Sequence, residues 1–216
     1  MIVVVGGVKG GTGKTTLATN LVVMRAKDKK VLLVDADEQR SASTWVQQRI
    51  YENIPTSWTT IQLTGVMLRD QIHKMKGDYD DIVIDVGGRE TASLRASAVI
   101  ADIYLVPFQP RSLDIWTIGN VKSIITDGKC YNPDMKAYAV INRADCVGFD
   151  NKDAIDILKN CDTLRCLSFV IGQRKAFANA SSNGLGVIEM KNPDKKAVKE
   201  MTALYNHLYK NDIKMT

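Results

Sequence analysis

The residues with the most definite chemistry lie in one short stretch, VKGGTGKTT, at positions 8–16. Its second half fits the phosphate-binding pattern G-x-x-x-x-G-K-[ST], with Gly13, Lys14 and Thr15 in the required order. Glycines let backbone N–H groups close around phosphate oxygens, the lysine reaches the β- and γ-phosphates, and the threonine hydroxyl binds Mg²⁺. The sequence therefore predicts a site for a nucleoside triphosphate with Mg²⁺. The expected nucleotide contacts are Gly10, Gly11, Thr12, Gly13, Lys14, Thr15 and Thr16.

Two residues of this stretch depart from the pattern. Val8 stands where the first glycine is expected, and Lys9 adds a second lysine. A lysine in a tight glycine loop, beside the loop's own positive groups, is electrostatically costly unless an anion lies nearby. Because Lys14 already serves the phosphates of its own loop, we expect Lys9 to reach a different anion.

A further carboxylate belongs to the same chemistry. The run DDIVIDVGGR places Asp85 at the end of an apolar strand. A carboxylate at such a position near the phosphate loop suits Mg²⁺ or its water shell, together with Thr15. Gly87 and Gly88 could let a backbone N–H meet the γ-phosphate and move after hydrolysis. For Arg89, phosphate contact, a helix cap and solvent exposure are all open.

Alternating strands and helices must position these residues. Near-continuous apolar runs such as VLLV and DIVIDV suit strands that are buried on both faces of a parallel sheet. The expected strands are Ile2–Gly6, Val31–Asp35, Thr59–Leu63, Asp81–Asp85, Ile103–Pro107, Ala137–Asn142 and Leu167–Ile171. Helical periodicity marks Thr15–Lys27, Ser41–Tyr51, Val66–Lys76, Leu113–Thr126, Asp153–Cys161 and a last helix from about Asp194, its N-cap, to Tyr209. The sequence predicts one α/β P-loop NTPase domain over residues 1–216, with a mostly parallel sheet flanked by helices on both faces.

Composition sets wider limits. The chain has 216 residues, 45% of them hydrophobic, and a net charge of +5, which permits an anionic partner without demanding one. Its four cysteines, Cys130, Cys146, Cys161 and Cys166, form no CxxC pair, so a zinc site is disfavoured. The N-terminus is typical of a buried strand rather than a signal peptide, and no uncharged run is long enough for a membrane span. We therefore expect a protein of the cytoplasm.

The stretch KGGTGKTT resembles the deviant Walker A loop of the ParA/MinD ATPases, relatives of the nitrogenase iron protein. In that family the extra lysine reaches across a dimer interface to the ATP of the partner. The resemblance therefore implies a two-subunit site in which Lys9 and Lys14 are both catalytic.

The segment from Asp35 to Gln39 is similar to the DxDPQ segment of the same family, with Glu38 where proline is usual. This match implies that Asp37 orients the attacking water. It also implies that Asp35 supports either the loop or the magnesium, in the second case beside Thr15 and Asp85. The family often carries prolines in the segment after the carboxylate that corresponds to Asp85. The residues GGR at positions 87–89 are therefore a departure from the family pattern.

Three later segments resemble those that surround the adenine in this family. They are VPFQPRSLD, AVINRAD and FVIGQRKAF. The resemblance implies that Asn142 hydrogen-bonds the base edge and that Gly172, where proline is frequent, contacts the base. The choice of ATP over GTP also rests on the resemblance, because AVINRAD lacks the lysine and the correctly spaced aspartate of a guanine-binding NKxD motif.

The family divides by what its members attach to. The first expected strand begins at residue 2, so we expect no N-terminal DNA-reading extension. The C-terminal stripe of Val198, Met201, Tyr205 and Leu208 is more typical of core packing than of membrane insertion. What remains is the small DNA-partition type, which coats nucleoid DNA non-specifically as an ATP-bound dimer. The candidate DNA-phosphate contacts are Arg174, Lys175, Lys191, Lys195, Lys196 and Lys199; taken singly, each lysine is equally typical of a solvated helix face.

The sequence thus predicts an ATP-dependent dimeric partition ATPase on the nucleoid, weakly active alone and stimulated by a ParB-like partner, with no membrane attachment. One alternative is a family member that positions protein cargo, such as chemoreceptor clusters or carboxysomes. The alternative from another class is a metabolic P-loop enzyme similar to dethiobiotin synthetase, for which we find no small-substrate signature.

Overall fold

The computed structural model describes residues 1–88, 92–110, 117–147 and 149–210. Within these ranges seven strands form one sheet in the order β3-β2-β4-β1-β5-β6-β7, and every neighbouring pair is parallel. The strands are β1 (Ile2–Val5), β2 (Val31–Asp35), β3 (Thr59–Gln62), β4 (Asp81–Asp85), β5 (Ile103–Phe108), β6 (Lys136–Ala144) and β7 (Arg165–Gly172). Each corresponds to a predicted strand, so the predicted parallel sheet is confirmed.

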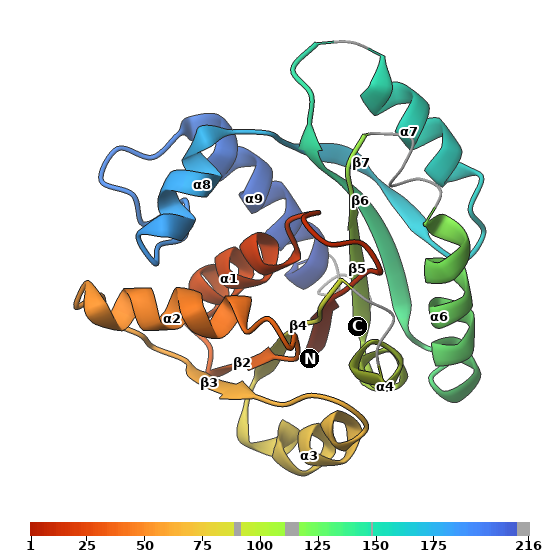
Figure 1. Ribbon diagram of the computed structural model, residues 1–216, viewed down its shortest axis with the longest axis horizontal. Coiled ribbons are helices and arrows are strands. Elements are labelled where there is room, and N and C mark those ends of the chain that lie inside the picture. Colours follow the sequence, from red (N-terminus) through yellow and green to blue (C-terminus); the bar gives the residue numbers. More distant parts are fainter. Residues whose placement is uncertain (89–91, 111–116, 148, 211–216) are drawn as a thin grey trace.

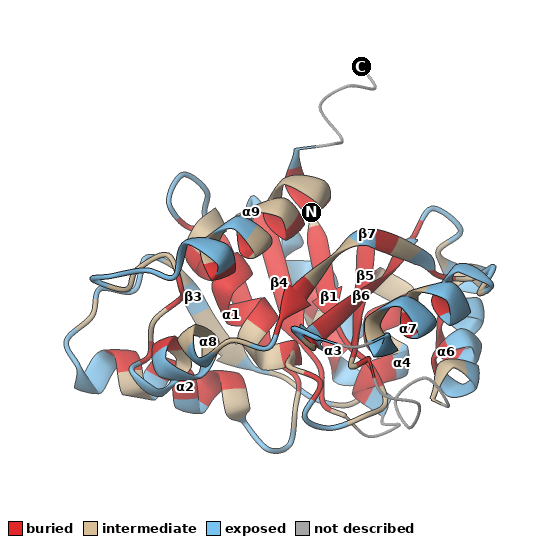
Figure 2. Cartoon of the chain, turned by 90° about the horizontal axis from the view of Figure 1, so that it is seen from above, coloured by how far each residue is buried: buried red, intermediate tan, exposed pale blue. Residues whose placement is uncertain are grey.

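Helices cover both faces of this sheet. Successive side chains of a strand point to opposite faces, and in β1 Ile2 and Val4 belong to one apolar cluster while Val3 and Val5 belong to the other. Residues of α3 (Met67–Met75), α4 (Ala92–Ile100), α6 (Ile118–Tyr131) and α7 (Asp150–Lys159) join the first cluster. Residues of α1 (Lys14–Arg25), α2 (Ser41–Tyr51), α8 (Lys175–Ser182) and α9 (Lys195–Tyr209) join the second. Figure 1 shows the two layers, and Figure 2 shows that the buried residues concentrate in the sheet between them.

Helix boundaries differ from the prediction mainly in the middle of the chain. The described part of α6 begins at Ile118 and ends at Tyr131, later than the predicted Leu113–Thr126, whose residues 113–116 lie outside the described ranges. Helix α7 begins at Asp150, three residues before the prediction. Helices α4 and α8 have no counterpart among the predicted helices. Helix α8 has only eight residues and therefore offers little more than two turns of apolar periodicity.

The last helix agrees with its prediction in detail. The Asp194 carboxylate accepts hydrogen bonds from the backbone N–H groups of Lys196 at 2.8 Å and Ala197 at 3.0 Å, so it is the N-cap. Met201 and Leu208 of the C-terminal stripe are buried in the second apolar cluster, which confirms core packing. No helix of the described ranges has the length and apolar composition needed to cross a bilayer.

Two buried side chains tie the segment before α9 to the helices that begin at the predicted nucleotide site. The Arg49 guanidinium of α2 binds both Glu189 oxygens, at 2.7 and 2.9 Å, and the carbonyl of Gly184 at 2.9 Å. Asn20 of α1 accepts the N–H of Val187 at 2.8 Å. Residues 184–189 are therefore held by α1 and α2 together.

Candidate nucleotide-binding site

The phosphate loop lies between β1 and α1, at the edge of the sheet where the parallel strands end. Strand β1 runs between β4 and β5, so its carboxyl end opens into the crevice in which α/β proteins bind ligands. Gly11 and Gly13 have φ values of 78° and 91°, in the left-handed region that favours glycine. The Leu17 N–H donates to the Gly13 carbonyl at 3.0 Å, which starts the helix directly at the loop. The N-terminus of α1 therefore faces the loop, as phosphate binding requires.

Lys14 and Thr15, in the first turn of α1, make two short contacts. The Lys14 side chain is 6% exposed, and its Nζ donates to the Lys9 carbonyl at 2.7 Å. The Thr15 hydroxyl donates to Asp85 Oδ2 at 2.6 Å. The structure thus brings together the threonine and the carboxylate that the sequence assigned to Mg²⁺.

Burial governs the chemistry of Asp85, which is 1% exposed. Loss of solvation raises the pKa of its carboxyl to about 7, the nearby carboxylates of Asp35 and Asp37 add to that rise, and the Thr15 hydrogen bond and Lys14 oppose it. No group of three His, Cys, Asp or Glu side chains that could hold a metal occurs in the described ranges. A pair of hard oxygen donors still fits Mg²⁺, which commonly takes few protein ligands and completes its shell with water and phosphate oxygens.

Asp35 has a different place from the other carboxylates. It is fully buried, and its two oxygens accept the backbone N–H groups of Asp37 at 3.2 Å and Ser43 at 2.7 Å. These bonds fix the turn after β2 and the first residues of α2. Of its two predicted roles, support of the loop agrees with these contacts, while the magnesium role stays a prediction.

Asp37 and the two glycines after β4 meet closely beside the phosphate loop. A Cβ on Gly87 would lie 2.7 Å from Asp37 Oδ1, and a Cβ on Gly88 would lie 2.6 Å from the backbone nitrogen of Gly10. Any side chain at either position would displace Asp37 or the loop. Steric contact therefore explains why glycines stand at positions 87 and 88, where the ParA/MinD family often has prolines. Arg89 lies outside the described ranges.

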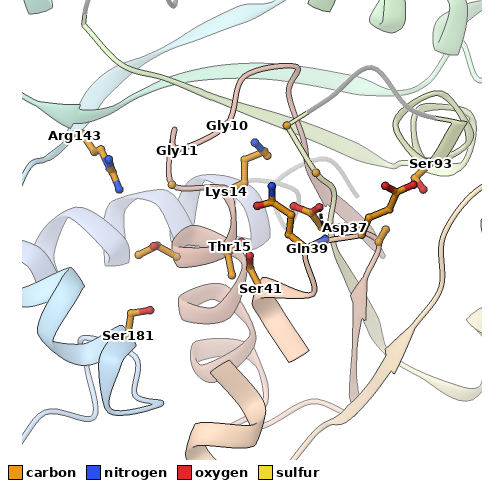
Figure 3. Close-up of a pocket in the computed structure, with 16 residues that line it drawn as sticks. Gly10, Gly11, Lys14, Thr15, Asp37, Gln39, Ser41, Ser93, Arg143 and Ser181 are labelled. Carbon is orange, nitrogen blue, oxygen red and sulfur yellow. Dashed lines mark hydrogen bonds between the residues drawn. The ribbon is translucent and has the colours of Figure 1, made fainter. Parts of the chain in front are cut away.

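A cavity of about 910 Å³ opens above the loop. Figure 3 shows Arg143 and Ser181 at one end of it and Asp37 and Ser93 at the other. Its described lining residues are Gly10, Gly11, Gly13, Lys14, Thr15, Thr16, Ala36, Asp37, Glu38, Gln39, Ser41, Gly87, Gly88, Ser93, Arg143 and Ser181. Most of the predicted phosphate contacts are therefore assembled around one space, whereas Lys9 is not among the described lining residues.

The two residues predicted to contact the base are not part of this lining either. The Asn142 side-chain amide donates to the Thr12 carbonyl at 2.6 Å, beneath the loop. The Gly172 N–H donates to Glu200 Oε2 at 3.0 Å, and Glu200 in turn binds Arg174. In this structure both predicted base contacts serve the protein's own framework.

Arg143 and Ser181 line the cavity but are not among the site residues predicted from the sequence. Arg143 has a φ of 54°, which is unusual for a residue with a side chain and is often associated with functional sites. It follows the predicted base contact Asn142 directly, and this position was a signal that could have identified it. Ser181 comes from α8, a helix that was not predicted.

The predicted DNA contacts gather at the starts of α8 and α9. Lys175, Lys191, Lys195, Lys196 and Lys199 are exposed. A groove of about 560 Å³ runs between the two helix starts, and its lining includes Lys195 and Lys196. Arg174 also lines this groove, but it forms an ion pair with Glu200 at 2.5 Å, and its side chain is only 21% exposed. The five lysines are therefore better placed than Arg174 to meet an external anion.

A parallel sheet with a glycine loop after its first strand, a lysine in that loop and a Thr15–Asp85 pair define a P-loop nucleotide-binding protein. The family model of the CobQ/CobB/MinD/ParA nucleotide-binding domain matches residues 2–187. The chain therefore belongs to this family, and the resemblance inferred from the loop is confirmed.

Proteins similar to this chain are named for different tasks. The chain is 24% identical over 211 residues to the maintenance of carboxysome distribution protein A of Halothiobacillus neapolitanus, covering 94% of each chain. An Asp-to-Ala variant of McdA from Cyanothece, solved with ATP, superposes with a TM-score of 0.80 at 17% identity, over 95% of each chain. A plasmid partition protein from Borrelia burgdorferi superposes with a TM-score of 0.71 at 18% identity, over 97% of this chain and 98% of that one. These two structural likenesses show the fold.

Proposed function

We propose that this protein is an ATP- and Mg²⁺-dependent ATPase that dimerises on binding ATP, attaches to DNA without sequence preference and positions a cargo on it. The observation that carries the proposal is the pair of lysines in one glycine loop. Lys14 lines the cavity above its own loop, while Lys9 is absent from the described lining. A loop with one lysine for its own nucleotide and a second for another anion suits a site shared by two subunits.

The chain's own groups can supply each part of ATP hydrolysis. Lys14 exchanges its contact with the Lys9 carbonyl for the β- and γ-phosphates, and the N–H groups of the loop bind the phosphate oxygens. Thr15 and Asp85 would hold Mg²⁺, which neutralises charge that develops on the phosphates. Asp37 lines the cavity and orients the attacking water. Closing of a second subunit over the cavity would exclude bulk water and bring in that subunit's Lys9.

DNA attachment rests on the basic surface at the starts of α8 and α9. Clustered lysines bind DNA by neutralising phosphates and need no base-reading motif. The first turns of α9 carry Lys195, Lys196 and Lys199, where the helix dipole is already positive, so the cluster favours an anion there. Dimerisation would place two such surfaces on one particle and strengthen binding through two attachments.

Two cargoes fit this chemistry. A partition ATPase would segregate plasmid or chromosomal DNA with a ParB-like partner, in agreement with the fold shared with the Borrelia partition protein. A positioning ATPase would move a protein assembly. The match over 94% of both chains to a carboxysome distribution protein supports this second candidate as well as the first is supported. Both belong on the nucleoid and both would be stimulated by a partner protein.

Binding to random-sequence DNA with and without ATP tests the proposal and separates it from a metabolic P-loop enzyme. We expect tight binding only with Mg²⁺ and ATP, and a steep loss of affinity as salt increases. Lys14→Ala is the control, because no other group replaces its charge at the phosphates, so this variant should bind neither ATP nor DNA. A wild-type protein that binds and hydrolyses ATP but shows no ATP-dependent attachment to DNA would refute the DNA-bound function.

A further inference from the structure

The carbonyl side of the phosphate loop is held by two side-chain amides from neighbouring strands. Asn142, in β6, is 5% exposed and donates its Nδ2 to the Thr12 carbonyl at 2.6 Å. Gln109, directly after β5, donates its Nε2 to the Gly11 carbonyl at 2.9 Å. Strands β5 and β6 are paired, with Phe108 opposite Ile141. One edge of the sheet thus presents two donors to two successive carbonyls of the loop.

These bonds determine which way the loop presents its N–H groups. In a trans peptide the carbonyl of one residue and the N–H of the next point in opposite directions, and no cis peptide occurs in the described ranges. When the Gly11 and Thr12 carbonyls point toward the amides, the N–H groups of Thr12 and Gly13 point away from them. Carbonyl oxygens repel phosphate and N–H groups attract it, so this orientation favours an anion on the far side of the loop.

The fit of Asn142 against the loop is close. A Cβ on Gly13 would lie 2.2 Å from Asn142 Nδ2, so the amide occupies the space that a side chain at position 13 would need. The glycine of the motif is therefore required at this position both by its φ of 91° and by contact with Asn142. Arg143 and Ser181 line one end of the cavity above the phosphate loop, where they remain available to contact a base or ribose.

We propose that Asn142, supported by Gln109, is a positioning residue for the phosphates: through its Nδ2 it holds the loop in its binding shape. This inference rests on the proposed function in so far as ATP is the ligand of this loop. It is distinct from the role that the family resemblance implies, in which Asn142 reads the adenine edge, because that role would use the side-chain oxygen.

Affinities for three probes distinguish the two roles: ATP, GTP and inorganic tripolyphosphate, each with Mg²⁺. Asn142→Asp keeps the shape of the side chain but replaces the donor with an oxygen facing the Thr12 carbonyl. We expect the affinity for all three probes to fall by a similar factor, about tenfold or more. Gln109→Glu should produce a smaller loss, again equal for all three, because Gln109 is less buried. Arg143→Ala should weaken ATP more than tripolyphosphate, which has no base.

A matched control lies at the amino ends of the same two strands, β5 and β6. Asn132 donates its Nδ2 to the Ala101 carbonyl at 2.8 Å, so Asn132→Asp removes the same kind of bond far from the loop. We expect it to lower the melting temperature without changing the affinity for any probe. If Asn142→Asp does not fold, Gln109→Glu carries the test alone.

One result would overturn the positioning role of Asn142, and a different result would overturn the proposed function. A loss of ATP affinity with unchanged tripolyphosphate affinity in Asn142→Asp, or in Gln109→Glu if the first does not fold, would overturn the positioning role and leave contact with the base as the explanation. Failure of the wild-type protein to bind either ATP or tripolyphosphate would instead overturn the proposed function.

Discussion

The Thr15 hydroxyl and the Asp85 carboxylate are joined by a hydrogen bond of 2.6 Å that links the first turn of α1 to the end of β4. The bond places the two expected Mg²⁺ ligands side by side. It also leaves a buried carboxylate whose pKa is raised to about 7, chiefly by loss of solvation. If Asp85 holds Mg²⁺ as proposed, proton and metal compete for the same oxygen atoms.

This competition predicts that binding of Mg²⁺–ATP weakens as the pH falls below 7. Below that pH the proton occupies Asp85, and the affinity should drop by up to tenfold per pH unit. Titrations at pH 6, 7 and 8 with wild type and Asp85→Asn measure the effect, because protonation of ATP itself is common to both proteins. Equal pH dependence in the two proteins would contradict the assignment of Asp85.

The same pKa has the opposite consequence for the nucleotide-free protein. The folded-state pKa lies above the ordinary value of 3.8, so the neutral acid is favoured in the folded state. The contribution of Asp85 to the free energy of unfolding is therefore fully present below about pH 4 and is lost as the pH rises toward 7. Urea unfolding at pH 5 and pH 8 should show Asp85→Asn gaining stability relative to wild type at the higher pH.

Asp37→Ala should retain ATP and accumulate the ATP-bound dimer. The phosphate contacts of the loop survive in this variant, while the group that orients water is removed. Turnover of ATP and sedimentation with ATP measure the two properties on one preparation. A variant that still hydrolyses ATP at the wild-type rate would reduce Asp37 to a structural residue that fills the space beside Gly87.

Loss of the buried arginine of α2 should destabilise the fold strongly. Arg49 is 2% exposed, pairs with Glu189 and lies over the rings of Trp45 and Trp58, at 5.4 and 4.9 Å. Arg49→Ala leaves the Glu189 carboxylate and the carbonyls of Gly184 and Pro55 without their donor, at a cost of about 3–5 kcal/mol. The matched control is Lys122→Ala, which breaks an exposed pair with Asp162 and should change the urea midpoint little. Similar midpoints for the two variants would show that the buried pair does not fasten residues 184–189.

The basic surface predicts a salt-dependent loss of DNA affinity in the triple variant Lys195→Ala, Lys196→Ala and Lys199→Ala. All DNA sequences should be affected alike, and the slope of affinity against salt should decrease because fewer counterions are displaced. The control replaces Lys27, Lys29 and Lys30, which are also exposed but lie directly before β2. Both triple variants lower the net charge of +5 equally. Equal loss of affinity in both would mean that total charge, and not this surface, holds DNA.

The sequence allowed the sheet and the phosphate end of the site to be predicted, for identifiable reasons. Strands buried on both faces are long apolar runs, and the loop motif fixes Lys14 and Thr15 relative to the strand before it and the helix after it. The end of the cavity that holds Arg143 and Ser181 could not be predicted so well. The orientation of Asn142 depends on β6 lying two places from β1 in the sheet, and α8, which supplies Ser181, is too short for a clear period. The need for glycine at positions 87 and 88 comes from contacts with residues about 50 and 80 positions earlier in the chain, which a local pattern does not contain.

The central claim, a site shared by two subunits, is tested most directly by Lys9→Ala. Nucleotide titration and light scattering with ATP should be measured on one preparation of this variant. We predict that the monomer still binds ATP through its own loop, Lys14 and Thr15, and that the ATP-induced dimer is absent, because two sets of nucleotide phosphates facing each other repel without a cation between them. DNA attachment and hydrolysis should be lost with the dimer. A Lys9→Ala protein that dimerises normally with ATP would contradict the shared site, and one that loses ATP affinity together with the dimer would show that Lys9 only stabilises its own loop.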